Sequence, residues 1–358
     1  MFSNVFLKSF RILLLPVALI YWLVVAIRNW LYDKNISRSS SFGLPVICIG
    51  NLSVGGTGKS PMVEYLVTRL KDNFKIAILS RGYKRRTKGY SLANPGTTAL
   101  DIGDEPMQFH TKFPDIPVAV GEERIVAIPL LLHDKPATQA IILDDAFQHR
   151  AIKAGLNILL TDYNNLFTRD FYLPTGDLRD LQSSYKRADI IVVTKCKPDL
   201  KRREANDILE EIGLLEHQQI FFTTFAYEKP YHIASHIQRV LDKETEVLLI
   251  AGIANPAPLK AMLEENSKTY TMSHFPDHHI FTIDDLKEIK KKFDRIESEN
   301  KIILTTEKDA TRLIKFRDDI NNLPLYIIPV RHRFLFDGGI GFDSTVIKFI
   351  ENFKSQEQ

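Results

Sequence analysis

Cysteine is scarce in this sequence, and the scarcity limits the cross-links and metal sites that it can form. The 358 residues include only Cys48 and Cys196, which lie far apart in the chain. A disulfide framework or a cysteine-rich zinc site is therefore excluded. We expect the main body of the protein to lie in a reducing compartment.

The chain also lacks a strong excess of charge of either sign. Its formal net charge is +3, but residues 1–40 alone carry +4, so that the remaining chain is near −1. The charged residues of that segment are Lys8, Arg11, Arg28, Lys34 and Arg38, against Asp33. A nucleic-acid-binding protein would carry its basic residues on the folded body. We therefore expect no nucleic-acid partner, and no required protein partner is evident.

A full-length membrane span is missing too, although one apolar run approaches it. Residues 12–27 contain no charge, whereas spanning a bilayer usually takes about 20 apolar residues. A secretory signal has a similarly short core, but no convincing small-residue cleavage site follows. The neighbouring cations, and the aromatic residues from Tyr21 to Tyr32, suit a membrane interface. We predict an uncleaved anchor that dips into or marginally crosses the inner leaflet; a helix buried in the protein is the alternative.

Strand-like and helix-like patterns alternate along most of the remaining chain, and this predicts an α/β protein. Short apolar runs indicate buried strands at Val46–Gly50, Lys75–Ser80, Ala140–Leu143, Asn157–Leu160, Ile190–Thr194, Val247–Ala251 and Lys301–Thr305. Helical periodicity follows Pro61 and recurs at Lys201–Ile212, Ile283–Phe293 and Ser344–Phe353. Such alternation predicts mostly parallel sheets flanked by helices, with a second, smaller α/β domain. The glycine-rich segment Gly55–Ser60, between a predicted strand and a predicted helix, predicts that the larger sheet is of the P-loop NTPase type.

The alternation breaks near residues 220–235, and we use this break to divide the chain. The predicted segments are an N-terminal membrane-anchoring helix (1–38), a P-loop core (39–220), a β-stranded linker (221–239), a smaller α/β domain (240–328), and a return segment with a C-terminal helix (329–358).

The most informative motif is Gly55-Gly56-Thr57-Gly58-Lys59-Ser60, between a predicted strand and a predicted helix. Glycines let backbone N–H groups approach phosphate oxygens, and the helix N-terminus adds a positive field. The strict P-loop pattern would place its first glycine at position 53, where this chain has Ser53. We predict that ATP phosphates are bound by Ser53, Val54, Gly55, Gly56, Thr57, Gly58, Lys59 and Ser60. Lys59 would bridge the β- and γ-phosphates, and Ser60 would reach Mg²⁺.

A second carboxylate site for Mg²⁺ is predicted at the end of a buried strand. Asp144 and Asp145 follow the apolar run Ala140–Leu143 and could hold the ion directly or through water. A solvated strand end is the alternative interpretation. A GTPase would place Asn/Thr-Lys-x-Asp after a late strand, but here Lys197 stands where Asp belongs, so the guanine-binding hypothesis is weak.

Candidates for proton transfer and for anion binding are more ambiguous. Asp104 is a candidate general base, although Asp after Gly is also a common turn pair. The segment His274–His279 could form a metal site, support a carboxylate base, or be a polar loop. The basic segment Arg81–Lys88, like the single cations Arg124 and Arg179, suits an anionic head group or membrane, but such charges are often only solvated.

Six motifs together resemble the tetraacyldisaccharide 4′-kinase family, the membrane-associated kinases of lipid A synthesis, over nearly the whole chain. They are Ile49-Gly50-Asn51-Leu52-Ser53-Val54-Gly55-Gly56-Thr57-Gly58-Lys59-Ser60-Pro61, Leu79-Ser80-Arg81-Gly82-Tyr83, Gly103-Asp104-Glu105-Pro106, Leu143-Asp144-Asp145-Ala146-Phe147-Gln148-His149, Phe275-Pro276-Asp277-His278 and Thr306-Glu307-Lys308-Asp309-Ala310. A small hydroxyl residue at position 53 is also similar to the family's loop.

The resemblance implies a reaction and a role for each matching residue. ATP would phosphorylate the 4′-hydroxyl of a tetraacylated glucosamine disaccharide 1-phosphate, a lipid A precursor. The catalytic residues would be Asp104 as base, His278 as its dyad partner and Lys59, with Ser60, Asp144 and Asp145 at the metal. The resemblance also implies an enzyme at the cytoplasmic face of the inner membrane.

Two departures from the family pattern concern single residues. Ala146 stands where the family usually has Gly, which should be tolerated unless the φ angle there is positive. Asp180 replaces the Glu of a Leu-Arg-Glu stretch and is one methylene shorter, so we do not expect it to be a direct metal ligand. The alternative functions are a membrane-associated P-loop NTPase that regulates or chaperones a protein, and a small-molecule kinase whose apolar N-terminus packs internally.

Overall fold

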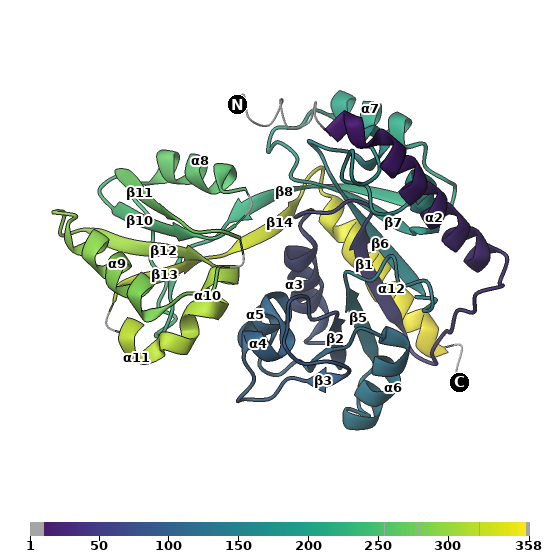
Figure 1. Ribbon diagram of the computed structural model, residues 1–358, viewed down its shortest axis with the longest axis horizontal. Coiled ribbons are helices and arrows are strands. Elements are labelled where there is room, and N and C mark those ends of the chain that lie inside the picture. Colours follow the sequence, from purple (N-terminus) through teal and green to yellow (C-terminus); the bar gives the residue numbers. More distant parts are fainter. Residues whose placement is uncertain (1–10, 254, 278, 322, 356–358) are drawn as a thin grey trace.

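The protein has two lobes joined by a pair of strands. The computed structural model describes residues 11–253, 255–277, 279–321 and 323–355. Figure 1 shows the N-terminal helix α2 (Leu15–Asp33) lying along the outside of the larger lobe. A short 3₁₀ helix, Ile12–Leu14, precedes it.

The larger lobe, which we call the core lobe, is built on a sheet of nine strands among the described residues. Their order is β14-β8-β7-β6-β1-β5-β2-β4-β3. Neighbours from β8 to β4 are parallel, whereas β14 and β3 pair antiparallel at the two edges. The strands are β1 Val46–Asn51, β2 Ile76–Ser80, β3 Ser91–Leu92, β4 Val118–Val120, β5 Ala140–Asp144, β6 Leu156–Asp162, β7 Ile190–Thr194, β8 Gln219–Tyr227 and β14 Val330–Phe334.

Helices cover both faces of this sheet, which explains why its central strands are continuous runs of Val, Ile and Leu. One face packs against α3, α5 and α12, and the other against α6 and α7. The bounds are α3 Lys59–Leu70, α4 Ala99–Ile102, α5 Asp104–Lys112, α6 Arg124–Asp134, α7 Arg202–Ile212 and α12 Gly338–Ser355, with 3₁₀ helices at Phe167–Arg169 and Gln182–Arg187.

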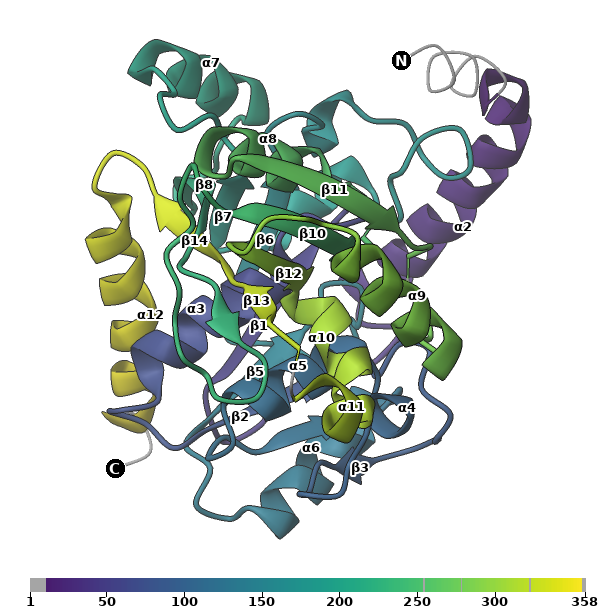
Figure 2. The same ribbon diagram turned by 90° about the vertical axis from the view of Figure 1, so that its left-hand side faces the viewer.

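The second lobe has its own sheet and its own hydrophobic core. Within the described part of the chain the strand order is β11-β10-β12-β13-β9, parallel except for β9. Figure 2 looks onto this lobe, where α8 covers one face of the sheet and α9, α10 and α11 cover the other. The elements are β9 Tyr231–His232, β10 Glu246–Ala251, β11 Thr269–His274, β12 Lys301–Thr306, β13 Leu325–Ile328, α8 Ala257–Asn266, α9 Ile283–Asp294, α10 Glu307–Leu313, the 3₁₀ turn Ile314–Phe316 and α11 Arg317–Ile320.

The predicted fold class is confirmed, with two local differences. The last helix begins at Gly338 rather than Ser344, because the intrinsically unfavourable glycines are stabilised by packing: a Cβ at Gly338 would lie 3.2 Å from the ring of Phe221. The segment where the alternation seemed to break begins with β8, which pairs with β7 in the core sheet. The division of the chain into domains stays a prediction.

Candidate active site

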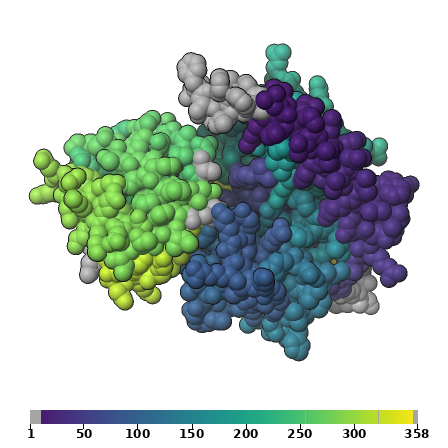
Figure 3. Space-filling model, viewed as in Figure 1, coloured from purple at the N-terminus to yellow at the C-terminus, as the bar shows by residue number. Residues whose placement is uncertain are grey.

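The candidate site lies where the carboxyl ends of the parallel strands of the core lobe face the second lobe. The phosphate loop connects β1 to α3, and the ends of β2, β5, β6 and β7 surround it. In open α/β sheets, ligands bind at this edge. Figure 3 shows a hollow between the two lobes.

The loop backbone has the conformation that its glycines were predicted to allow. Gly58 has φ +89°, and a Cβ there would come within 3.0 Å of the His332 ring. A Cβ at Gly55 or Gly56 would meet no atom within 4 Å, so the space in front of these peptides is open. The backbone of Val54 is anchored on the other side, where its N–H donates to the Asp177 carbonyl at 2.7 Å. The loop is thus fixed at its ends and open in its middle.

Two buried, neutral side chains hold the base of the loop. His332 Nε2 lies 2.9 Å from the Gly58 carbonyl and must be the donor there, because a carbonyl only accepts. Burial lowers the pKa of His332 to about 4, so the ring is neutral and its Nδ1 accepts from the Thr223 hydroxyl at 2.9 Å. The Thr194 hydroxyl donates to the Thr57 carbonyl at 2.8 Å.

Lys59 stands in a network of alternating charge. Its Nζ lies 3.2 Å from Asn51 Oδ1 and 3.8 Å from Asp145 Oδ1. Arg179 bonds both Asp145 oxygens and Asn51 Oδ1. Burial raises the pKa of Asp145, but Lys59 and Arg179 outweigh that effect and lower it to about 2. Asp145 is therefore ionised and already neutralised by two cations.

Asp144 differs sharply from its neighbour and is the carboxylate that fits a metal ion. It is 1% exposed; its Oδ2 accepts from the Ser80 hydroxyl at 2.9 Å, and its Oδ1 has no hydrogen-bond partner among the described residues. Burial, then Glu105 and Asp145, raise its pKa to about 7. A buried oxygen left without a partner, beside a like charge, suits a hard cation such as Mg²⁺. Ser60, at the start of α3, supplies a hydroxyl on the loop side.

No cluster of three or more His, Cys, Asp or Glu side chains is arranged for a metal among the described residues. His279, from the histidine-rich segment, instead contacts Asp285 at 3.0 Å.

Asp104 begins α5 and is held from the second lobe. Gly103 before it has φ +92°, and a Cβ there would come within 2.9 Å of the Tyr83 carbonyl, so only glycine fits this entry. Arg312, on α10, donates Nε to Asp104 Oδ1 at 2.9 Å and Nη2 to Oδ2 at 2.5 Å. The predicted partner His278 lies outside the described residues.

A second group of charges, which we call the interlobe seam, lies beside this pair. It consists of Glu64 on α3, Lys112 on α5, Glu307 on α10 and Arg331 on β14. Lys112 bonds Glu64 at 2.6 Å and Glu307 at 2.5 Å, and Arg331 bonds the same two carboxylates at 2.8 and 3.0 Å. Burial and the charge of Glu307 raise the pKa of Glu64, which is 1% exposed. Through these ion pairs the seam connects α3 with α5 and β14 of the core lobe and with α10 of the second lobe.

Other sequence candidates are used structurally. Arg124 is 1% exposed; it donates to the Gly121 carbonyl at 2.8 Å, and burial lowers its pKa to about 10. In the basic segment, Arg85 pairs with Glu122 at 2.7 Å. Asp180 accepts from Asn29 of α2 at 2.7 Å, so this acid is turned to the N-terminal helix. Ala146 does not have a positive φ angle; its neighbour Asp145 does, at +48°.

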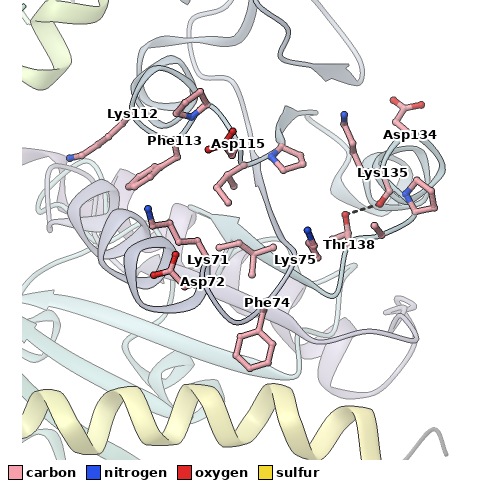
Figure 4. Close-up of a pocket in the computed structure, with 16 residues that line it drawn as sticks. Lys71, Asp72, Phe74, Lys75, Lys112, Phe113, Asp115, Asp134, Lys135 and Thr138 are labelled. Atoms are coloured by element: carbon pink, nitrogen blue, oxygen red, sulfur yellow. Dashed lines mark hydrogen bonds between the residues drawn. The ribbon is translucent and has the colours of Figure 1, made fainter. Parts of the chain in front are cut away.

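A separate cavity of about 450 Å³ lies at the opposite edge of the core sheet. Figure 4 shows Lys71 and Lys75 on one side of it and Lys135 on the other. Its lining includes the turns that lead into β2, β4 and β5, hence the amino ends of these strands. It is therefore not part of the candidate site.

Three residues of the site were not identified by sequence reasoning. Arg179 was only one of several ambiguous cations, and Arg312 and His332 were not singled out. Arg312 lies 208 residues from Asp104, and His332 lies 274 residues from Gly58. The motif Thr306–Ala310, two residues before Arg312, was the one local signal near any of the missed partners.

Comparisons with known proteins agree over almost the full length. The family model described as tetraacyldisaccharide-1-P 4′-kinase matches residues 10–346. The tetraacyldisaccharide 4′-kinase of Bacteroides thetaiotaomicron is 44% identical, over 94% of this chain and 92% of that protein. The one of Flavobacterium johnsoniae is also 44% identical, over 95% and 97%.

One solved structure adds the fold. The crystal structure of LpxK from Aquifex aeolicus in complex with ATP is similar with a TM-score of 0.74 and 28% identity, covering 95% of this chain and 99% of that one. The extent of these matches shows that the chain belongs to the tetraacyldisaccharide-1-P 4′-kinase family.

Proposed function

We propose that this protein transfers the γ-phosphate of ATP to the 4′-hydroxyl of a tetraacylated glucosamine disaccharide 1-phosphate. The observation that carries the proposal is the open phosphate loop, with Lys59 and the Asp144–Asp145 pair at its side, in a chain of this kinase family. The LpxK structure that it resembles holds ATP. A bond forms between the 4′-oxygen and the γ-phosphorus, the bond from that phosphorus to the β,γ-bridging oxygen breaks, and ADP leaves.

The roles follow from charge and position. The loop of residues 53–60, through N–H groups other than that of Val54, and the Lys59 ammonium bind the phosphates, and Arg179 fixes Asp145 beside Lys59. Asp144 and the Ser60 hydroxyl would hold Mg²⁺ directly, and Asp145, whose oxygens already bind Arg179, would hold it through water. When bound, this ion neutralises charge that develops on the phosphate oxygens.

Asp104 accepts the proton of the 4′-hydroxyl. Arg312 donates to both oxygens of this carboxylate, and one of the same oxygens would accept the proton of the hydroxyl. Because Arg312 fixes both oxygens, it orients the base and ties its position to that of the second lobe. His278 is proposed as a further support for this base, as the family resemblance implies.

The N-terminal helix is proposed to hold the enzyme on the cytoplasmic face of the inner membrane. Among the described residues, only the stretch Ile12–Asp33, with mean hydropathy 2.0, is long and apolar enough to cross a membrane. Its polar contacts with the core lobe, such as Asn29 to Asp180, favour a helix that lies in the interface, because these bonds would be broken in a bilayer-spanning position.

Regulation of a protein partner is the less supported alternative. The guanine-binding motif is incomplete, because Lys197 stands where its Asp belongs. Lys195, at the position of the motif's own Lys, pairs with Asp162 at 2.6 Å. The matched relatives are named as kinases of a disaccharide.

The test is transfer of label from γ-labelled ATP to the disaccharide 1-phosphate in mixed micelles containing Mg²⁺. We expect labelled lipid from the wild type, almost none from Lys59→Ala, and none from an acceptor that lacks the 4′-hydroxyl. Lys75→Ala, at the remote cavity, is the matched control and should keep full turnover. Absence of labelled lipid from the folded, ATP-binding wild type would refute the proposal.

A further inference from the structure

Helix α2 has one apolar face that is exposed and one face that docks on the core lobe. Ala18, Val25 and Asn29 are buried and lie at spacings of seven and four residues, so they share one stripe of the helix. Tyr21 falls on the same stripe. The exposed face carries Leu15, Val17, Leu19, Ile20, Leu23, Val24, Ile27 and Trp30. The exposed face is sufficient for a membrane anchor, so the polar contacts of the docked face need a separate explanation.

The docked face forms hydrogen bonds with a short segment, residues 179–184. The Tyr21 hydroxyl donates to the Arg179 carbonyl at 3.0 Å. The Asn29 amide, 3% exposed, donates to Asp180 Oδ1 at 2.7 Å and contacts Ser184 Oγ at 3.2 Å. Burial of an amide is costly unless it is bonded. The Asn29 nitrogen is bonded to this acid, whereas its Oδ1 has no hydrogen-bond partner among the described residues, so the nitrogen end alone is fitted to Asp180.

This segment is itself part of the nucleotide site. The Arg179 N–H donates to the Leu52 carbonyl at 2.8 Å, at the entry to the phosphate loop. The Arg179 side chain bonds Asp145 and Asn51, and Asn51 in turn contacts Lys59. One residue therefore connects the docked face of α2 with the acid, the amide and the lysine of the loop.

A second connection runs through the loop after β5. Arg28 donates to the Gln148 carbonyl at 2.6 Å, and the Gln148 amide donates to the Asn51 carbonyl at 2.8 Å. Arg150 returns a bond to the Asn29 carbonyl at 2.8 Å. Both loops that flank the phosphate loop are thus bonded to the same helix.

We propose that α2 is a working part of the nucleotide site, in which Tyr21 and Asn29 are positioning residues that hold Arg179 and Asp145 in register with the phosphate loop. The helix then has two separable tasks: its exposed face contacts lipid, and its docked face sets nucleotide affinity. This inference rests on the proposed function only in that the bound nucleotide is ATP.

The experiment measures binding of a fluorescent ATP analogue with Mg²⁺ to the full chain in detergent, without acceptor lipid. Tyr21→Phe removes one hydroxyl and should weaken nucleotide binding about threefold. Asn29→Leu removes a hydrogen bond to a carboxylate and should weaken nucleotide binding about tenfold. In turnover assays the same loss should appear in KM for ATP, with KM for the disaccharide and binding to anionic vesicles unchanged.

A matched control separates positioning from lost stability. Asn157→Leu removes another Asn–Asp contact, to Asp189 at 3.3 Å, at the amino end of β6. It should lower the melting temperature as Asn29→Leu does while leaving nucleotide affinity unaltered. Tyr21→Phe keeps the test available if Asn29→Leu does not fold.

Two results distinguish the possible failures. Unaltered nucleotide affinity in Tyr21→Phe and in any folded Asn29→Leu would overturn the positioning role and leave α2 as an anchor alone. A wild type that binds the analogue but labels no disaccharide would instead refute the proposed substrate, and the effect of both substitutions on nucleotide affinity would still decide the inference.

Discussion

Helix α3 is held at two places, and the two fastenings differ in kind. Its start is fixed by two neutral hydrogen bonds, which we call the neutral fastening. Thr194 on β7 and His332 on β14 donate these bonds to carbonyl groups of the phosphate loop. One turn later, Glu64 enters the interlobe seam and meets Lys112 and Arg331. Both donors of the neutral fastening belong to the core sheet, whereas the seam also includes α10 of the second lobe. The neutral bonds therefore fix the phosphate loop to its own sheet. The ion pairs of the seam connect the core lobe to the second lobe.

The largest effect is expected at the charged contact between the lobes that joins Asp104 to Arg312. Asp104→Asn keeps an oxygen for Arg312 but removes the proposed base, so kcat should fall by about 10²–10⁴. Nucleotide affinity should stay near that of the wild type, because the phosphate loop is held by other groups. Steady-state kinetics and analogue binding measure the two quantities separately.

Arg312→Lys is the companion variant, since it keeps the charge and loses the two-pronged bond. It should lower kcat by only about tenfold. Equal losses in the two variants would mean that Asp104 merely joins the lobes and is not the base.

An effect on stability, rather than on turnover, is tested by removing one of the seam's cations. Arg331→Met leaves Glu64 and Glu307 to share Lys112, and breaking a buried ion pair in this way costs about 3–5 kcal/mol of unfolding free energy. Urea unfolding measures this loss. The exposed pair of Glu288 with Lys292 is the control, because Glu288→Gln should change the unfolding free energy by less than about 1 kcal/mol. A similarly small value for Arg331→Met would contradict the buried character of the seam.

Acid should lower the contribution of His332, in the neutral fastening, to the unfolding free energy. The pKa of His332 is lowered from 6.5 to about 4 in the folded protein, so the unfolded chain binds the proton more tightly. Stability from this group is complete above pH 6.5 and is lost as the pH falls toward 4, at about 1.4 kcal/mol per pH unit.

His332→Gln keeps a donor for Gly58 and should flatten the unfolding free energy over that window, as followed by urea unfolding at several pH values. His133→Gln, on the exposed side of α6, should leave the slope as it is in the wild type. A slope that persists in His332→Gln would assign the acid sensitivity to other groups.

Local patterns were sufficient to predict the phosphate loop, the two acids at the end of β5, and the central strands β1, β2, β5, β6, β7, β10 and β12. A buried parallel strand is a continuous apolar run, and Gly55–Ser60 follows one directly, so both are visible within about ten residues of sequence. The confirmed fold class rests on this alternation. The roles of the site residues stay predictions.

What the sequence could not provide is the set of partners that converge from distant segments. Arg312 reaches Asp104 only because α10 docks beside α5, and Asn29 reaches Asp180 across 151 residues. The start of α12 was placed six residues late, since the low helix propensity of Gly338, Gly339 and Gly341 is overcome by packing on an aromatic cluster that local patterns do not reveal.

The paired strands β8 and β14 have a consequence for how the second lobe is attached. The chain leaves the core lobe at Tyr227 and returns at Val330, and these two residues face each other in the antiparallel register. The lobe is thus an insertion within one hairpin, and its excision would leave ends that a short turn could join. A protein shortened in this way would keep the loop and its neutral fastening but lose Arg312, and would separate nucleotide binding from transfer in a single chain.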